Sequence, residues 1–289
     1  MGNLRLFLVC VAIWGSTWLA IKFQLGRVEP EASVFYRFLL SSALIFAYCL
    51  ARGKPLRYPP REHLWLALLG VLMFGLSYIC VYYAERHVVS GLVAVGYSAS
   101  PLLGMLGMRL FFGTPMTRRV IAGSILGIVG IALVFQPEFS RLHGDGDTVT
   151  GAIFTVLAVV VSTLGSMVAH RNHEARIPLW QGMAWGMLYG SIFSLAVALA
   201  TGRRLGFEVT PGYILSLVYL AVLGSIIAFG AFLTLLKRVG AARAGYIGVM
   251  VPIVALFVSA AFEGFQWHAL TWIGIAVSVA GNVIVLRGK

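Results

Sequence analysis

The sequence predicts an all-α, polytopic membrane protein in which ten transmembrane helices form two inverted five-helix repeats. Three observations lead to this fold class: an apolar composition, a series of runs long enough to cross a membrane, and a second half that repeats the first. Of the 289 residues, 60% are hydrophobic and 11% are charged, and the mean hydropathy is +0.90. Soluble domains carry about 25% charged residues, so this chain lacks the polar surface that water requires.

Apolar runs follow one another along the chain, and about 20 such residues are needed for a helix to cross the hydrocarbon core. Proline, glycine and charged residues separate the runs, as at Gly53-Lys54-Pro55. The first run continues too far for a cleaved secretory signal, so it is predicted to be the first transmembrane helix. The predicted helices span residues 4–23, 32–51, 64–84, 88–112, 120–135, 149–169, 179–201, 213–236, 241–262 and 270–286.

The second half of the chain repeats the first at an offset of 151 residues. Gly91–Pro101 aligns without a gap with Ala242–Pro252, and the two prolines fall in register. We therefore predict a first repeat over 1–136, a linker over 137–148 and a second repeat over 149–289. Because each repeat has an odd number of helices, the second copy enters the membrane upside down. Inverted repeats are typical of secondary transporters, whose substrate site lies near the midplane between the halves.

Pro101 and Pro252 lie inside apolar runs at equivalent places. A proline removes a backbone hydrogen bond and bends a helix, so the two are predicted as hinges that line a cavity or, alternatively, as packing kinks. Small residues recur at close spacing in the last helix of each repeat and favour tight helix packing over chemistry. They are Gly123, Gly127 and Gly130 in the first half and Gly274, Ser278 and Gly281 in the second.

The net charge of +12 comes from 22 Lys and Arg that lie almost entirely between the apolar runs. Most of them fall on the side of the N-terminus, and the positive-inside rule then predicts that both termini are cytoplasmic. No basic stripe interleaved with aromatic residues is present, so nucleic acid is not predicted as a partner. The cysteines lie inside apolar runs without metal-ligand spacing, so we expect no metal and no cofactor.

The Asp, Glu and His residues lie in loops or near the ends of the predicted helices. An exporter of lipophilic cations would place a carboxylate in mid-membrane, and an intramembrane hydrolase would need a catalytic cluster there. Neither is found in the sequence, so an enzyme is not predicted. The membrane interior is instead neutral and aromatic, which predicts a substrate that is neutral or zwitterionic overall.

Hydroxyl groups and aromatic rings within the predicted helices are the candidates for substrate contact, because they can hydrogen-bond a small solute and cover its apolar part. The alternative is that they serve helix–helix hydrogen bonds and interfacial aromatic belts. The predicted substrate-binding residues are Trp14, Ser16, Thr17, Tyr78, Tyr82, Tyr97, Ser100, Ser166, Trp185, Tyr189, Tyr246 and Met250.

Three motifs carry a resemblance to a known family: Trp14-Gly15-Ser16-Thr17-Trp18, the segment from Ser90-Gly91 to Pro101, and the segment from Gly240 to Pro252. The chain resembles the EamA-type family of the drug/metabolite transporter superfamily, and within it most resembles the YddG-type amino-acid exporters. The resemblance implies a ten-helix carrier in a bacterial inner membrane that exports aromatic and other neutral amino acids. One departure is Gly113-Thr114, where the family often has a Gly-Glu pair.

The leading hypothesis is therefore an inner-membrane carrier that exports neutral amino acids or related small metabolites by alternating access. The alternatives are a carrier for another neutral metabolite, such as a sugar or a nucleoside derivative, and a non-transport membrane enzyme or scaffold. The lipid bilayer is the expected surrounding. Proton coupling and oligomeric state are left open, and a monomer is sufficient because the inverted halves supply the symmetry that a carrier needs.

Overall fold

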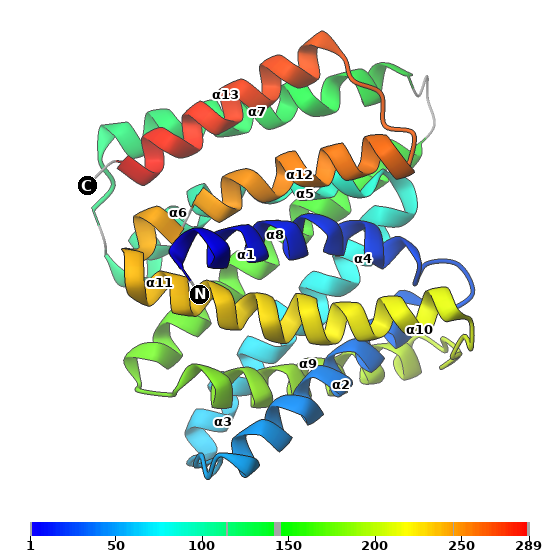
Figure 1. Cartoon of the computed structure of the whole chain (residues 1–289), viewed down its shortest axis with the longest axis vertical. Helices are drawn as coiled ribbons and strands as arrows, with labels where there is room; N and C mark the ends of the chain where they lie inside the picture. Colours follow the sequence, from blue (N-terminus) through cyan, green and yellow to red (C-terminus); the bar gives the residue numbers. More distant parts are fainter. Residues whose placement is uncertain (1, 114, 142–145, 245, 288–289) are drawn as a thin grey trace.

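The protein is a bundle of long helices that lie roughly alongside one another (Figure 1). The computed structural model describes residues 2–113, 115–141, 146–244 and 246–287, and within these ranges it contains no strand. The first half comprises α1 (Asn3–Lys22), α2 (Pro30–Ala51), α3 (Pro60–Leu69), η1 (Gly70–Leu76), α4 (Ser77–His87), α5 (Ser90–Gly96), η2 (Tyr97–Ala99), α6 (Ser100–Phe112) and α7 (Arg118–Arg141). The second half comprises α8 (Gly146–Glu174), α9 (Leu179–Ala200), α10 (Pro211–Val218), η3 (Tyr219–Ile227), α11 (Ala228–Ala244), α12 (Tyr246–Phe262) and α13 (Ala269–Arg287).

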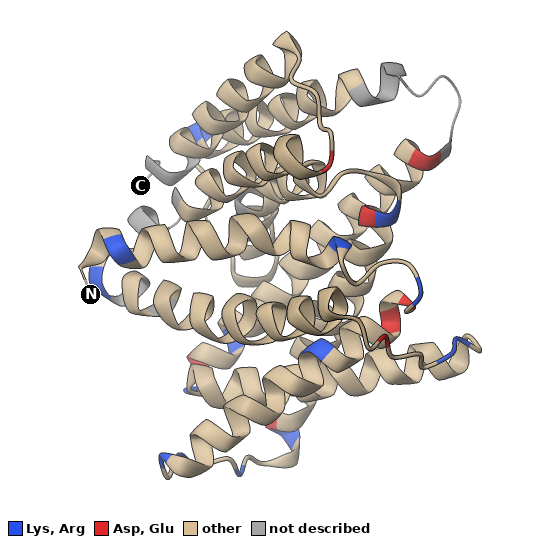
Figure 2. Cartoon of the chain, turned by 45° about the vertical axis from the view of Figure 1, so that its right-hand side comes forward, with Lys and Arg blue, Asp and Glu red and all other residues tan. Residues whose placement is uncertain are grey.

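Eight of the described helical stretches are long and apolar enough to cross a membrane, and two shorter apolar helices, Ile247–Phe262 and Ala269–Ile284, follow them. Charged residues gather toward the two ends of the helices and leave a largely uncharged band between them (Figure 2). Large apolar side chains such as Ile125 and Val156 are exposed on the outer helices, as lipid contact requires. These findings confirm the predicted class, an all-α polytopic membrane protein.

Several helices are longer than their apolar runs. The helix α7 continues to Arg141 and α8 begins at Gly146, so both enter the segment that was predicted as a linker. The remaining linker residues, 142–145, lie outside the described residues, as does Thr114. The ninth predicted helix, 241–262, corresponds to α12, which begins at Tyr246 because α11 extends to Ala244. Backbone hydrogen bonding carries a helix beyond the apolar segment wherever its polar end residues can reach water.

The offset of 151 residues recurs in the local structure. Pro60 and Pro211 each stand in the first turn of a helix, where the missing N–H costs nothing. Each of these helices then widens into a π-helical segment, η1 and η3, at matching positions. Gly113 and Gly264 follow the helices α6 and α12 with φ of 69° and 71°, a left-handed conformation that favours glycine.

The helices α7 and α13 pack together through their glycines. A Cβ added at Gly130 would lie 2.6 Å from the carbonyl oxygen of Gly274, and one added at Gly281 would lie 2.4 Å from that of Gly123. Gly281 matches Gly130 at the offset of 151, and Gly274 matches Gly123, so the internal repeat relates one contact to the other. The close approach of the two backbones confirms that the spaced small residues serve helix packing.

Candidate substrate cavity

A cavity of about 380 Å³ lies in the middle of the bundle, between helices of both halves. The first half contributes α1, the segment from η1 to α4, and the segment from α5 to α6, and the second half contributes α8, α11 and α12. Aromatic rings and hydroxyl groups alternate with small apolar residues in its lining. None of the described residues that line it is charged. The volume and the lining suit a small solute with an apolar part and a few polar groups.

Half of the predicted substrate-binding residues line this cavity, and so does one of the two predicted hinge prolines. They come from five separate helical regions, which only the tertiary fold brings together. The residues are Trp14, Thr17, Tyr78, Tyr97, Ser100, Ser166 and Pro252.

Two polar groups of the lining are buried without a hydrogen-bond partner, the indole nitrogen Nε1 of Trp18 and the hydroxyl of Ser100. A buried donor without a partner costs free energy, so these two are the groups best placed to bond a solute. The ring of Trp18 packs against that of Tyr97 at 5.2 Å between centroids, which holds it at the cavity wall. Trp18 was quoted in the sequence motif but was not among the predicted site residues.

Most other hydroxyls of the lining are satisfied within the protein. The hydroxyl of Thr17 donates to the carbonyl of Trp14 at 2.8 Å, and that of Ser166 donates to the carbonyl of Ser162 at 3.0 Å. The Tyr97 hydroxyl lies 3.2 Å from that of Ser77. A hydroxyl that donates to its own helix keeps lone pairs free, so this wall of the cavity presents mainly acceptors.

The other predicted substrate contacts whose side chains the structure describes do not line the cavity. The hydroxyl of Ser16 lies 2.6 Å from that of Tyr219, and fully buried Tyr82 donates to Gln24 at 2.5 Å. Met250 is 37% exposed. The side chains of Tyr246 and Pro101 lie outside the described residues. Pro101 stands in the first turn of α6, directly after the 3₁₀ turn η2, whereas Pro252 lies inside α12.

Trp185 and Tyr189 stack on one face of α9, as their spacing predicted, but neither lines the cavity. The Trp185 indole donates to the carbonyl of Leu56 at 3.0 Å, and the Tyr189 hydroxyl lies 2.9 Å from Nδ1 of His63. Both side chains thus bind the loop before α3 and the start of that helix.

The expectation of an interior without buried charge is wrong. Arg37, in the second turn of α2, is 2% exposed, and Glu85, near the end of α4, is fully buried. Nε and Nη1 of Arg37 and both carboxylate oxygens of Glu85 have no hydrogen-bond partner. The sequence placed both residues near helix ends, where side chains usually reach water, and only the packing of the neighbouring helices buries them.

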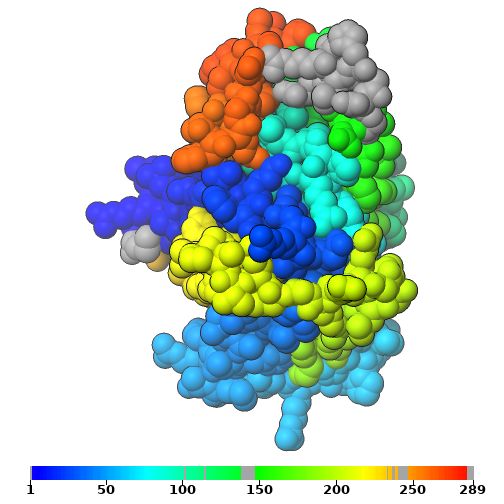
Figure 3. Space-filling model, turned by 90° about the vertical axis from the view of Figure 1, so that its right-hand side faces the viewer, coloured from blue at the N-terminus to red at the C-terminus, as the bar shows by residue number. Residues whose placement is uncertain are grey.

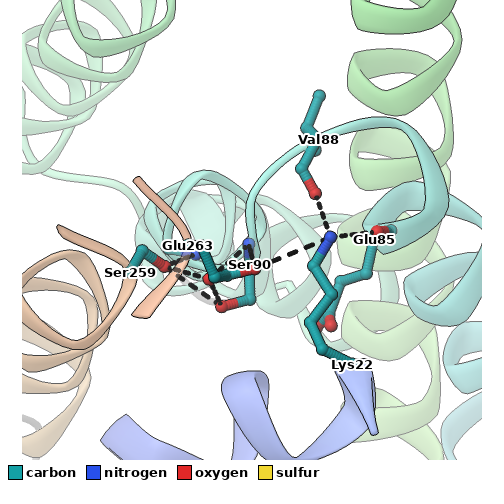
Figure 4. A network of polar contacts seen from close by, with 7 residues as sticks. Lys22, Glu85, Val88, Ser90, Ser259 and Glu263 are labelled. Carbon is teal, nitrogen blue, oxygen red and sulfur yellow. Dashed lines mark hydrogen bonds and ion pairs between the residues drawn. The ribbon is translucent and has the colours of Figure 1, made fainter. Parts of the chain in front are cut away.

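A network of polar contacts joins the ends of several helices near the cavity (Figure 4). The ammonium of Lys22 donates to the carbonyls of Glu85 and Val88 at 2.6 and 3.1 Å, and it lies 3.6 Å from a carboxylate oxygen of Glu263. Glu263 accepts from the backbone N–H and the hydroxyl of Ser90, and from the hydroxyl of Ser259. The network therefore ties the ends of α1, α4 and α12 to the start of α5.

This network lies one helical turn beyond the cavity lining. Residues four apart share a helix face, and Lys22 and Glu85 follow the lining residues Trp18 and Val81 by four. We call this the Lys22 end of the cavity. Figure 3 looks onto this end, where segments of the first half (blue to cyan) and of the second half (yellow to orange) lie against one another.

The opposite end of the cavity is bounded by glycines. A Cβ added at Gly104 or Gly248 would meet no atom within 4 Å, so both face open space. The positions that match Ser259 and Glu263 at the offset of 151 hold Met108 and Phe112, which cannot form the same network. The offset of 151 therefore does not repeat this network.

A many-helix membrane bundle with a central cavity lined from both halves defines a membrane transporter. The model of the EamA-like transporter family matches residues 3–136 and again residues 149–287, so the chain belongs to this family. It is 30% identical over 281 residues to the uncharacterized inner membrane transporter YedA of Escherichia coli K12, covering 96% of this chain and 88% of the relative. The chain is accordingly a multi-pass inner-membrane transporter, as the resemblance implied.

More distant relatives match over similar lengths. The protein PecM of Dickeya dadantii is 24% identical over 275 residues, covering 94% of this chain and 88% of that protein. A solved crystal structure matches with a TM-score of 0.70 and 18% identity, covering 98% of this chain and 95% of that one, which shows that the fold is shared.

Proposed function

We propose that the protein is a secondary carrier that moves neutral or zwitterionic small metabolites, amino acids first among them, outward across the inner membrane. The observation that carries this proposal is the central cavity, whose lining pairs aromatic rings with hydroxyl groups and holds no charged side chain among the described residues. A cavity of about 380 Å³ is of the size that small-molecule sites have. The family membership supports a transport function, and the chemistry of the cavity lining supports a neutral or zwitterionic substrate.

We further propose that the two halves are inverted copies that exchange conformations during transport. The matching prolines, π-helical segments and glycine contacts at the offset of 151 support this interpretation. With cytoplasmic termini, the Lys22 end faces outward. The polar network then closes the outer side of the cavity, while the glycine-bounded end faces the cytoplasm. This arrangement suits the intake of a solute from inside before release outside.

Counterflow in proteoliposomes tests the proposal. Vesicles that contain the purified protein and unlabelled phenylalanine should accumulate labelled phenylalanine, threonine or methionine. Trp14→Ala, which removes a ring from the cavity lining, should abolish the exchange, whereas Trp272→Ala, on a 51% exposed side chain, should not. Absence of exchange for all three amino acids would rule out this cargo. Exchange of a labelled sugar or nucleoside instead would favour the alternative cargo, and transport with and without a pH gradient would establish coupling.

A further inference from the structure

The guanidinium of Arg37 is a buried cation near the cavity with unused hydrogen-bonding capacity. Its side chain is 2% exposed, and two of its three nitrogens, Nε and Nη1, have no partner. No carboxylate of the described residues lies within 4.0 Å of it. A charged side chain inside a membrane bundle is costly unless it pairs or serves a function.

Aromatic rings hold the guanidinium in place. Its Cζ lies 4.6 Å from the ring centroid of Tyr78 and 5.2 Å from that of Phe38, so both rings stabilise the cation through their faces. The guanidinium interacts electrostatically with the hydroxyl of Tyr82 and with the carboxylate of Glu85, and no ion pair joins it to an acidic side chain of the described residues. These contacts stabilise the positive charge and leave the N–H donors of Nε and Nη1 unused.

The guanidinium lies directly behind the cavity wall. Tyr78 lines the cavity, and the cation rests over its ring, so the guanidinium and the cavity share this side chain as a neighbour. Thr17, another lining residue, approaches from the side: a Cβ added at Gly224 would lie 2.9 Å from Thr17 and 3.7 Å from Nη2 of Arg37. A small displacement of the Tyr78 ring would open the free donors to a bound solute.

We propose that Arg37 binds the carboxylate of the transported solute, so that a carboxylate is a requirement for recognition; this rests on the proposed carrier function. The planar guanidinium matches a carboxylate in a two-point geometry, and in a water-poor site such hydrogen bonds are strong. The solute's apolar part would lie among Trp14, Trp18 and Tyr97 of the lining. Amines and alcohols that lack the carboxylate are then poor substrates.

A carboxylate fits this position better than a phosphate. A phosphate carries up to two negative charges, and its sites usually gather several cations. The other cation near this end of the cavity, Lys22, already donates to two carbonyls and pairs with Glu263. Arg37 alone therefore matches a singly charged group.

The experiment measures binding to the full-length protein in nanodiscs with four probes that share one ring: 3-phenylpropanoate, phenylalanine, 3-phenylpropan-1-ol and phenethylamine. We expect the two carboxylates to bind, and the alcohol and the amine to bind about 10- to 150-fold more weakly. Arg37→Gln should weaken the carboxylates by a similar factor and leave the alcohol unchanged. Arg52→Gln, on an exposed residue just beyond the same helix, should change none of the four.

The four probes can be measured on the parent protein alone. This series therefore tests whether a carboxylate is required even if Arg37→Gln does not fold. Equal binding of the alcohol and the carboxylate, or unchanged carboxylate affinity in Arg37→Gln, would overturn the assignment. Arg37→Lys, which keeps the charge but loses the two-point geometry, should bind carboxylates with an affinity between those of the parent and Arg37→Gln. If the carboxylates bind through Arg37 but no amino acid exchanges in counterflow, the proposed cargo fails and this inference stands. If amino acids exchange equally in Arg37→Gln, the inference fails and the carrier function stands.

Discussion

The polar network at the Lys22 end makes a quantitative prediction about Glu263. Its carboxylate accepts hydrogen bonds from the N–H and hydroxyl of Ser90 and from the hydroxyl of Ser259, and it pairs with Lys22. The substitution Glu263→Gln keeps the shape of this side chain and removes its charge. The Lys22–Glu263 pair is partly buried, with side-chain exposures of 30% and 9%, so most of the cost comes from weakening the hydrogen bonds that the charged carboxylate accepts, about 1.5–3 kcal/mol.

This cost falls on the closed state of the Lys22 end, where these contacts exist. If they are absent when that end opens, the equilibrium shifts toward the open state by the same free energy. Since each 1.4 kcal/mol is a factor of ten, the expected shift is about one to two powers of ten. A carrier that strongly favours closure at this end would then open there for a larger share of the time.

The assay is labelling of a cysteine inside the cavity by a membrane-impermeant maleimide. Ser100→Cys supplies the thiol in a chain whose Cys10, Cys49 and Cys80 are replaced by Ala, since all three native cysteines are free. Glu263→Gln should increase the labelling rate from the Lys22 end by at least tenfold. Glu29→Gln, which disturbs more exposed ion pairs with Arg86 and Arg203, should not. An unchanged rate in Glu263→Gln, or an equal increase in Glu29→Gln, would refute the reasoning.

Four further predictions concern packing, access, recognition and the balance between the two open states. Gly130→Leu should lower the melting temperature and the yield of folded protein, because its Cβ would meet the backbone of α13 at 2.4 Å, whereas Gly206→Leu should have little effect. Gly104→Phe should leave the melting temperature unchanged, because its Cβ meets nothing within 4 Å, and should block counterflow by filling the cavity; normal exchange would show that solutes take another route. Ser100→Ala should weaken substrate binding about fivefold to tenfold without loss of stability, since the hydroxyl has no hydrogen-bond partner among the described residues, and unchanged affinity would remove it from the site. Pro252→Ala should alter the balance between the two open states more than substrate affinity, and equal labelling of a cavity cysteine from both sides in variant and parent would count against a hinge there.

Part of the site was predictable from the sequence. Trp14, Thr17, Tyr78 and Tyr97 are polar or aromatic residues inside apolar runs, and the cavity contains all four. The same criterion also selected Trp185 and Tyr189, whose side chains bind the loop before α3 and the start of that helix instead. Type and depth along a helix can be estimated from sequence, but the direction in which a side chain points into the bundle depends on the neighbours that pack against each face.

The sequence by itself determined the membrane location, the helical class and the family, because these follow from the length, spacing and apolar character of the runs and from motifs within them. The tertiary structure alone decided which residues share the cavity and which charges are buried. Arg37 and Glu85 look like helix-end residues in the sequence, yet neighbouring helices cover both. Burial is a property of the packed bundle, and so the residue assigned here to carboxylate recognition became visible only when the helices were placed around it.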